Sequence, residues 1–345
     1  MSPRVPRLAM QNRSNRLNRL KLWGAGALGV EAETCGIRPA SEDASFRLYY
    51  RLTFPGGHCI AVYSPPERED NRAFLDVAKR LRDGGLNVPE VIATDLERGF
   101  LLLSDLGERT YLDALATEDP EPLYEDALAA LARMQRRADA SGLPDYDRPL
   151  LLGEMELFER WLLREHLQLR LQKADAALLR RSFSLLADAA LAQPRVFVHR
   201  DYHSRNLMRM ADSNPGILDF QDAVYGPYSY DLVSLLKDCY ICWPPARVRR
   251  WACSYLRRAQ ALGLYARIGE EEWLRDFEWM GMQRHLKAAG IFARLWLRDG
   301  KRDYLPHLPR TLAYIVAAQG AQAPLPELRA WLRERALPRL ERAPQ

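Results

Sequence analysis

The sequence predicts an α+β protein of two lobes, in which a small antiparallel sheet precedes a larger, mainly helical part. Short apolar or alternating segments bounded by turn residues lie before residue 105, as strands require. Long segments with apolar residues at three- and four-residue spacing fill most of the chain after residue 110. At 345 residues and 48% hydrophobic, the chain can bury a large core and divide into two parts.

Residues 1–24 are expected to form a basic tail or helix. They carry six cations and no acid, so subtracting them from the formal net charge of +5 leaves −1 for the rest. A nearly neutral body argues against a broad nucleic-acid-binding face. The sequence contains no stretch of about 18 apolar residues, so no membrane-spanning helix is expected. Five scattered cysteines favour a reducing cytoplasm over a disulfide framework.

Residues 25–105 are expected to form the small lobe. The segments 45–54 and 58–63 flank a Pro-Gly-Gly turn and predict a hairpin. Apolar residues at helical spacing predict a helix that ends at Gly84 and leaves Lys79 on its solvated face. The segments 87–95 and 99–107 then predict two further strands.

Residues 106–345 are expected to form the helical lobe. Periodic apolar positions predict helices at 122–140, 154–171 and 174–192. A further helix is expected to start at Asp231, whose carboxylate would cap it, and to include Cys239 and Cys242 as core thiols. The last hundred residues are predicted to be helical, with most of their aromatic residues in the core.

The residues with the clearest chemistry lie between 195 and 222. Two short apolar strands flank a polar loop that holds Asp201 and Asn206, and Asp219 follows the second strand. Phosphoryl transfer needs a carboxylate that orients an attacking hydroxyl, together with oxygen ligands for magnesium. Hard cations prefer such ligands, which Asn206 and Asp219 supply.

The segments HRDYHSRN and ILDFQD resemble the catalytic and metal loops of the protein-kinase-like superfamily, and in particular of its aminoglycoside-phosphotransferase branch. The resemblance implies a protein-kinase-like two-lobe fold that uses ATP and Mg²⁺. It implies the following roles: Asp201 as catalytic base, His203 beside the transferred phosphoryl, Asn206 and Asp219 as magnesium ligands, and His199 and Asp231 as braces of the loop.

The same resemblance implies that the first hairpin covers the nucleotide. Backbone amides of Ser45 and Phe46 would then contact the phosphates. Residues 104–106, which are Ser104, Asp105 and Leu106, would meet the adenine. Relatives usually carry a lysine in the second strand, but residues 60–63 contain none. One hypothesis gives its task to Arg47, and the alternative is a solvated hairpin arginine.

The whole chain, including the PPERED segment after the lysine-free strand, resembles the bacterial anomeric N-acetylmuramate/N-acetylglucosamine kinases of cell-wall sugar recycling. This resemblance implies ATP-dependent phosphorylation of the C1 hydroxyl of a small amino sugar, without an obligatory protein partner. Candidate substrate contacts are Arg205, Gln221, Asp222, Asp238 and Arg284.

Two other functions stay open on the sequence: an aminoglycoside or other amino-alcohol kinase, and a nucleotide-binding pseudokinase that acts as a scaffold. A cationic aminoglycoside requires an acidic cleft, whereas a pseudokinase would normally have lost Asp201, Asn206 or Asp219. A protein kinase is disfavoured because Gln221 follows Phe220 and the segment before Asp231 is too short for an activation loop.

Overall fold

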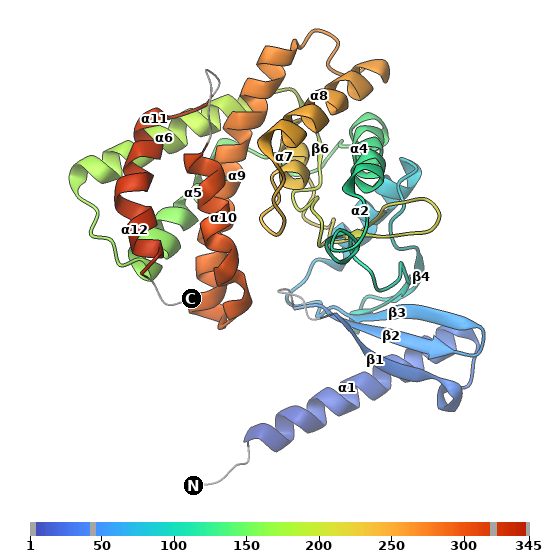
Figure 1. Ribbon diagram of the computed structural model, residues 1–345. Helices are drawn as coiled ribbons and strands as arrows, with labels where there is room; N and C mark the ends of the chain where they lie inside the picture. The colour runs from blue at the N-terminus through green and yellow to red at the C-terminus, as the bar shows by residue number, and fades with distance from the viewer. Residues whose placement is uncertain (1–4, 42–45, 318–322, 343–345) are drawn as a thin grey trace.

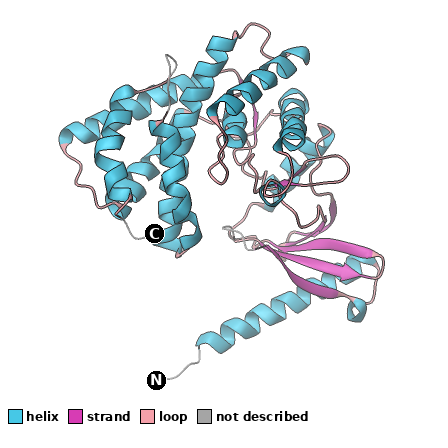
Figure 2. Cartoon of the chain, in the orientation of Figure 1, coloured by secondary structure: helices cyan, strands magenta, loops and turns pink. Residues whose placement is uncertain are grey.

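The computed structural model describes residues 5–41, 46–317 and 323–342, so Ser45 lies outside the described residues. Figure 1 shows a sheet at one end of the molecule and helices over the rest. Figure 2 shows that the long strands gather in this one sheet. The predicted fold class is therefore confirmed.

The N-terminal sheet is antiparallel, with the strand order β1-β2-β3-β5-β4. Its strands are β1 Gly36–Ser41, β2 Leu48–Phe54, β3 Gly57–Tyr63, β4 Val91–Asp95 and β5 Phe100–Ser104. β2 and β3 form the predicted hairpin, because Gly56 takes a φ of +108° that a residue with a Cβ rarely adopts. The edge strand β1 was not predicted, since it contains Pro39, which only an edge position tolerates well.

The N-terminal segment is a helix, α1 Val5–Leu28, and its second half packs on the sheet. Leu20 and Ala25 share a buried cluster with Leu52 and Leu102 of the strands. Gly24 permits this contact, since a Cβ there would lie 2.9 Å from the Leu52 side chain. The expected tail or helix is thus resolved as a helix, which Figure 1 shows extending beyond the sheet.

Helix α2 Asn71–Asp83 lies between the sheet and the helical part of the protein. Asp70 caps it by accepting hydrogen bonds from the backbone N–H groups of Arg72 and Ala73. Its apolar face joins the large core together with residues of β3 and β5. Lys79 is exposed and pairs with Asp83, which confirms that it lies on the solvated face.

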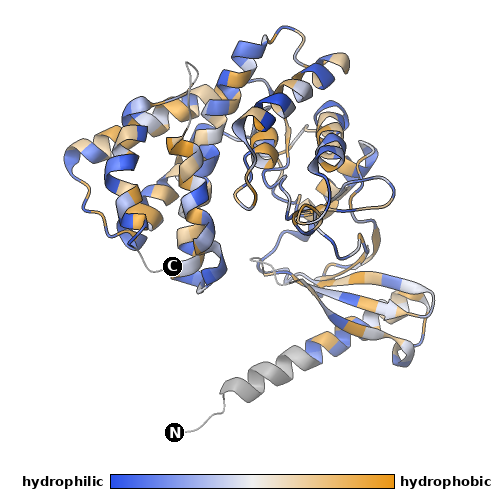
Figure 3. Cartoon of the chain, in the orientation of Figure 1, coloured by the Kyte–Doolittle hydropathy of each residue, from blue (hydrophilic) through white to orange (hydrophobic). Residues whose placement is uncertain are grey.

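The rest of the chain is mainly helical. Its α-helices are α3 Tyr111–Ala114, α4 Pro120–Arg137, α5 Arg148–Leu157, α6 Lys173–Leu191, α7 Tyr230–Leu236, α8 Pro245–Ala261, α9 Glu270–Asp299, α10 Leu308–Val316, α11 Pro326–Trp331 and α12 Leu337–Leu340. Other helical segments are the 3₁₀ turns Ala32–Thr34 and Arg302–His307 and the π-helical Phe158–His166 and Leu332–Ala336. Figure 3 shows polar and apolar residues alternating along these helices, as expected for elements with one buried face.

Two predicted helices differ from the structure. The helix expected at 154–171 begins at Arg148, after the Asp147 cap, becomes π-helical at Phe158 and ends at His166. The helix expected to include Cys239 and Cys242 ends at Leu236, and the Asp231 carboxylate does not cap it. Cys239 is buried and Cys242 is exposed, so only one of the two predicted core thiols is in the core.

Two pairs of short strands hold the polar loop that the sequence singled out. They are β6 Arg195–Val198 with β9 Val224–Pro227, and β7 Leu207–Met208 with β8 Gly216–Ile217. Both predicted strands around the loop are therefore confirmed. Among the described residues, no helix is long and apolar enough to cross a membrane.

Candidate active site

A cavity of about 600 Å³ lies between the sheet and the helical part. Its walls come from the sheet, the segment after β5, the loops after β6 and β8, and helix α9. It is lined by nine of the residues named above as candidates, namely Ser104, Asp105, Leu106, Asp201, His203, Arg205, Asn206, Asp219 and Arg284. Residues separated by up to 180 positions are thus brought into one site.

The loop after β6 is held from inside by two buried side chains. The Asp231 carboxylate, fully buried, accepts hydrogen bonds from the backbone N–H groups of His199 at 2.7 Å and Arg200 at 3.0 Å. The His199 ring accepts one from the N–H of Asp201 at 3.2 Å. Burial lowers the pKa of His199 to about 4, so the ring is neutral and can accept this bond.

Backbone strain gathers at the same place. Arg200 and Asp219 both have positive φ angles, +76° and +63°, which non-glycine residues seldom adopt. Such conformations persist where surrounding contacts hold them, and they concentrate in functional sites. For Arg200 those contacts are its bond to Asp231 and the ion pair of its guanidinium with Glu154.

Asp201 carries an ionised carboxylate at the cavity wall. Burial raises the pKa of this group, but the positive charges of Lys287, Arg200 and Arg284 outweigh burial and hold the pKa below its ordinary value. A carboxylate that stays ionised can orient a hydroxyl and accept its proton.

Two of the cations around Asp201, Lys287 and Arg200, are fixed by one buried carboxylate, Glu154. It pairs with Lys287 at 3.0 Å and with Arg200, and it accepts a hydrogen bond from Tyr146. Lys287 also donates to the hydroxyl of Tyr230 at 2.9 Å. Burial raises the pKa of Glu154, but the two cations outweigh burial, so Glu154 is ionised.

Asn206 and Asp219 lie side by side, as a shared cation would require. The Asn206 amide nitrogen donates to the backbone carbonyl of Asp201 at 3.0 Å and to the Asp219 carboxylate at 3.3 Å. Gln221 donates to the other Asp219 oxygen at 2.8 Å. One carboxylate and one amide oxygen, open to the cavity, suit Mg²⁺ that is shared with nucleotide phosphates. The described residues contain no group of three or more His, Cys, Asp or Glu suited to a metal.

His203 lines the same cavity as Arg205, Arg284 and Lys287, and the part of the wall formed by these four residues is called the acceptor side below. It is buried and packs edge-on against Tyr240, with 5.3 Å between the ring centres. Burial lowers its pKa, so the ring is mainly neutral near pH 7. Its position is compatible with the predicted place beside the transferred group, and this role stays a prediction.

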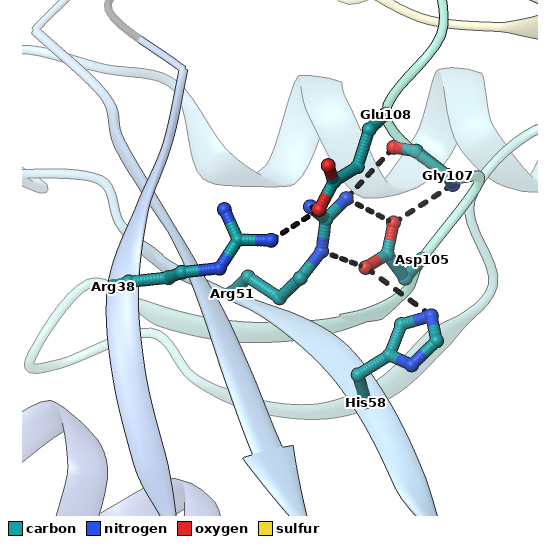
Figure 4. Close-up of polar contacts among 6 residues, drawn as sticks. All are labelled: Arg38, Arg51, His58, Asp105, Gly107 and Glu108. Carbon is teal, nitrogen blue, oxygen red and sulfur yellow. Dashed lines mark hydrogen bonds and ion pairs between the residues drawn. The ribbon is translucent and has the colours of Figure 1, made fainter.

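The opposite end of the cavity is bounded by an ion network on β1, β2 and the segment after β5 (Figure 4). Arg51 pairs with Asp105 and Glu108 and donates to the Gly107 carbonyl at 2.8 Å, and Arg38 also pairs with Glu108. Ser104 is tied to the segment before β4, since its hydroxyl accepts a hydrogen bond from the N–H of Glu90. The predicted adenine contacts at 104–106 therefore rest on a braced segment.

Arg47 does not line the cavity. Its side chain is buried, donates to the Ser64 hydroxyl at 3.2 Å and pairs with Glu69 at 3.1 Å. The backbone N–H of Phe46 also donates to Glu69. The alternative reading of Arg47 as a solvated arginine is wrong, while its role toward phosphates stays a prediction without direct geometric support.

Three candidate substrate contacts also lie outside the cavity lining. Asp238 is fully buried and accepts hydrogen bonds from the Ser204 N–H and hydroxyl and from the Tyr240 N–H. Gln221 holds Asp219, and Asp222 is exposed. As substrate contacts these residues stay predictions, whereas Arg205 and Arg284 do reach the cavity.

Glu154, Lys287 and Arg51 were not among the site residues predicted from the sequence. Their partners lie on other elements, so the pairs could not be identified from spacing.

The chain was compared with known proteins. A family model described as the phosphotransferase enzyme family matches residues 36–273. A protein of Pseudomonas putida named N-acetylmuramate/N-acetylglucosamine kinase is 45% identical over 91% of each chain. One of the same name from Pseudomonas aeruginosa is 46% identical over 89% of this chain and 88% of its own. The solved structure of a Plasmodium vivax ethanolamine kinase shares the fold, with a TM-score of 0.60, 10% identity and 82% coverage of both chains.

Proposed function

Because the chain belongs to the phosphotransferase enzyme family, we propose that it is a sugar kinase that transfers the γ-phosphoryl group of ATP to the C1 hydroxyl of N-acetylmuramate and N-acetylglucosamine. The observation that carries this proposal is the identity of 45–46% to kinases of that name over about nine tenths of each chain. The site supports it, because an ionised Asp201 lies beside a pair of magnesium-type ligands.

Each residue of the loop has a task in this reaction. Asp201 orients the C1 hydroxyl and accepts its proton, and Glu154 keeps Lys287 and Arg200 in place around that carboxylate. Asn206 and Asp219 would hold Mg²⁺, which supplies charge neutralisation of the nucleotide phosphates. His203 is neutral and leaves Asp201 as the base.

The C1 hydroxyl suits a base with a low pKa. A hydroxyl on the anomeric carbon is more acidic than an ordinary alcohol, so it needs less help from Asp201 to lose its proton in the transition state. Positioning and electrostatic stabilisation can then carry most of the catalysis.

The other two functions fit the site less well. A pseudokinase scaffold does not need Asp201, Asn206 and Asp219, which are all present at the cavity. A polycationic aminoglycoside would meet Arg205, Arg284 and Lys287 on the acceptor side. The proposal places the protein in the cytoplasm, where ATP and reduced thiols occur, in the recycling of cell-wall sugars.

The test is to incubate the protein with ATP, Mg²⁺ and a panel of amino sugars and aminoglycosides while following ADP release. We expect turnover with the two N-acetylated sugars and a product that has lost its reducing end and releases phosphate in mild acid. A product that stays reducing would place the phosphate elsewhere, and turnover only with aminoglycosides would replace the proposal.

A further inference from the structure

Arg284 of α9 is a buried cation without a carboxylate partner in the part of the chain that the structure describes. It is 5% exposed and lines the cavity. Its one hydrogen bond to a side chain is a weak contact to the Cys239 sulfur at 3.6 Å, and its Nε atom has no partner among the described residues. A buried charge is costly unless it is paired, so this guanidinium is suited to an anion that enters the cavity.

A second cation, Arg205, faces the same end of the cavity. Its guanidinium lies 4.8 Å from the ring centre of Tyr240 and 5.7 Å from that of Tyr304. Contacts with the rings and hydroxyl groups of these two tyrosines hold its planar group, which has five N–H donors in all.

Neither Arg284 nor Arg205 forms an ion pair with a carboxylate of the described residues, although the charges of Asp201 and Asp238 act on Arg284. Lys287 is paired with Glu154, while Asp238 lies outside the cavity lining and is held by Ser204 and Tyr240. Four carboxylates line the cavity among the described residues: Asp105 and Glu108 pair with Arg51, and Asp201 and Asp219 are the base and a magnesium ligand of the proposed function.

We propose that Arg284, assisted by Arg205, binds the carboxylate of an acidic amino sugar, so that the enzyme prefers N-acetylmuramate over N-acetylglucosamine. This inference rests on the proposed function. The two sugars differ in a lactyl ether at O3, which adds one carboxylate two ring carbons away from C1. When the C1 hydroxyl lies at Asp201, that carboxylate stays within the cavity that Arg284 and Arg205 also line. Arginine engages a carboxylate through two parallel N–H donors.

An oxyanion near Arg284 has two possible sources, the acceptor's carboxylate and the phosphoryl group in transfer. The two sources predict different kinetics. Loss of a carboxylate contact lowers kcat/KM for N-acetylmuramate alone, whereas loss of a phosphoryl contact lowers it equally for both sugars.

The first experiment uses the unaltered enzyme. We expect kcat/KM for N-acetylmuramate to exceed that for its carboxamide and for N-acetylglucosamine by about 10- to 100-fold, the usual effect of a hydrogen-bonded charged group. Equal values for the acid and its amide would overturn the inference. Failure to phosphorylate either sugar would instead overturn the proposed function.

The second experiment compares Arg284→Met with Arg294→Met, a control on the same helix at a position that does not line the cavity. Arg284→Met should reduce the ratio of kcat/KM for N-acetylmuramate to kcat/KM for N-acetylglucosamine to near one. Arg284→Lys should restore part of this ratio, and Arg294→Met should leave it unchanged. Thermal unfolding verifies that each variant is folded. If Arg284→Met does not fold, Arg205→Gln is measured in its place, because Arg205 is exposed. Its ratio of kcat/KM for N-acetylmuramate to kcat/KM for N-acetylglucosamine should also decrease. An unchanged ratio in folded variants contradicts the inference.

Discussion

At the residue scale, the site depends on buried charges that hold one another. Asp201 stays ionised despite burial because Lys287, Arg200 and Arg284 surround it, and Glu154 fixes two of these cations. This arrangement explains how a single carboxylate can act as a base near neutral pH without being protonated by its own burial.

Exchange of Asp201 for asparagine separates chemistry from nucleotide binding. Asp201→Asn should lower kcat by about 10²- to 10⁴-fold, because it removes the group that accepts the proton. Asp219→Ala should instead weaken Mg-ATP binding, because it removes a charged ligand. Kinetics and calorimetry measure the two effects. Retention of activity within about tenfold in Asp201→Asn, or unchanged Mg-ATP affinity in Asp219→Ala, contradicts the assigned role.

Asp231 should make the stability of the protein depend on pH. Burial raises its pKa to about 7, against an ordinary value of 3.8. Between these values the folded protein holds a proton that the unfolded chain has lost, so the contribution of Asp231 to folding is complete below pH 3.8 and decreases as pH rises through 7.

The measurement is urea unfolding of the natural protein and of Asp231→Asn across that pH range. We expect the variant to be less stable at low pH, because an amide replaces the acceptor of two backbone hydrogen bonds. The difference in the free energy of unfolding between the two proteins should become smaller toward pH 8. A difference that widens with pH would show that the pKa of Asp231 is lowered in the folded protein.

Sequence patterns indicated the candidate catalytic residues more readily than the residues that support them. Asp201, Asn206 and Asp219 lie within nineteen positions of one another, so order and spacing revealed them. Lys287 and Glu154 could not be assigned, because their pairing joins α5 to α9 across 133 positions. The hydrogen bonds of Asp238 with Ser204 and Tyr240 could not be predicted for the same reason, and its role as a substrate contact stays a prediction.

At the element scale, helix α9 is the support on which the acceptor side is built. It supplies Arg284 and Lys287 to the cavity and packs against α5, α6, α7 and α10. Gly290 permits its approach to α5, since a Cβ there would lie 2.5 Å from the Leu157 carbonyl carbon and the Phe158 nitrogen. That contact coincides with the change from α- to π-helix at Phe158, which apolar spacing alone could not predict.

Gly290→Ala should destabilise the protein although alanine favours helices. The clash is with backbone atoms that cannot rotate away, so we expect a loss of about 1–3 kcal/mol in the free energy of unfolding. Gly281→Ala on the same helix is the control, because its Cβ would meet only side chains, namely the flexible end of Lys237 at 3.4 Å and Val233 at 3.8 Å. It should be neutral or gain up to about 1 kcal/mol. Equal effects of the two substitutions would show that α9 can shift away from α5.

At the scale of the whole molecule, the two-lobe architecture followed from local patterns, whereas the composition of the cavity did not. The β2–β3 hairpin and helices α2, α4 and α6 were predicted close to their observed bounds, because turn residues and helical spacing are local signals. The cavity is formed by residues from both parts, and contacts such as that of Arg51 with Asp105 depend on how strands and loops are placed.

The Arg51–Asp105 pair is expected to couple the sheet to the segment that leads into the helical part. Both side chains are at most 8% exposed, and Figure 4 shows them facing each other between β2 and that segment. Burial raises the pKa of Asp105, but its hydrogen bond with Arg51 and the nearby N–H of Gly107 outweigh burial, so the pKa is lowered and the pair is ionic.

Removal of one partner leaves the other charge buried, which costs about 3–5 kcal/mol. Asp105→Ala and Arg51→Met should each destabilise by that order, and the double variant should lose clearly less than the sum. Arg38→Met is the matched control, because Arg38 pairs with the same Glu108 but is 57% exposed, and it should cost less than about 1 kcal/mol. Strictly additive losses in urea unfolding would show that Arg51 and Asp105 stabilise the two parts independently.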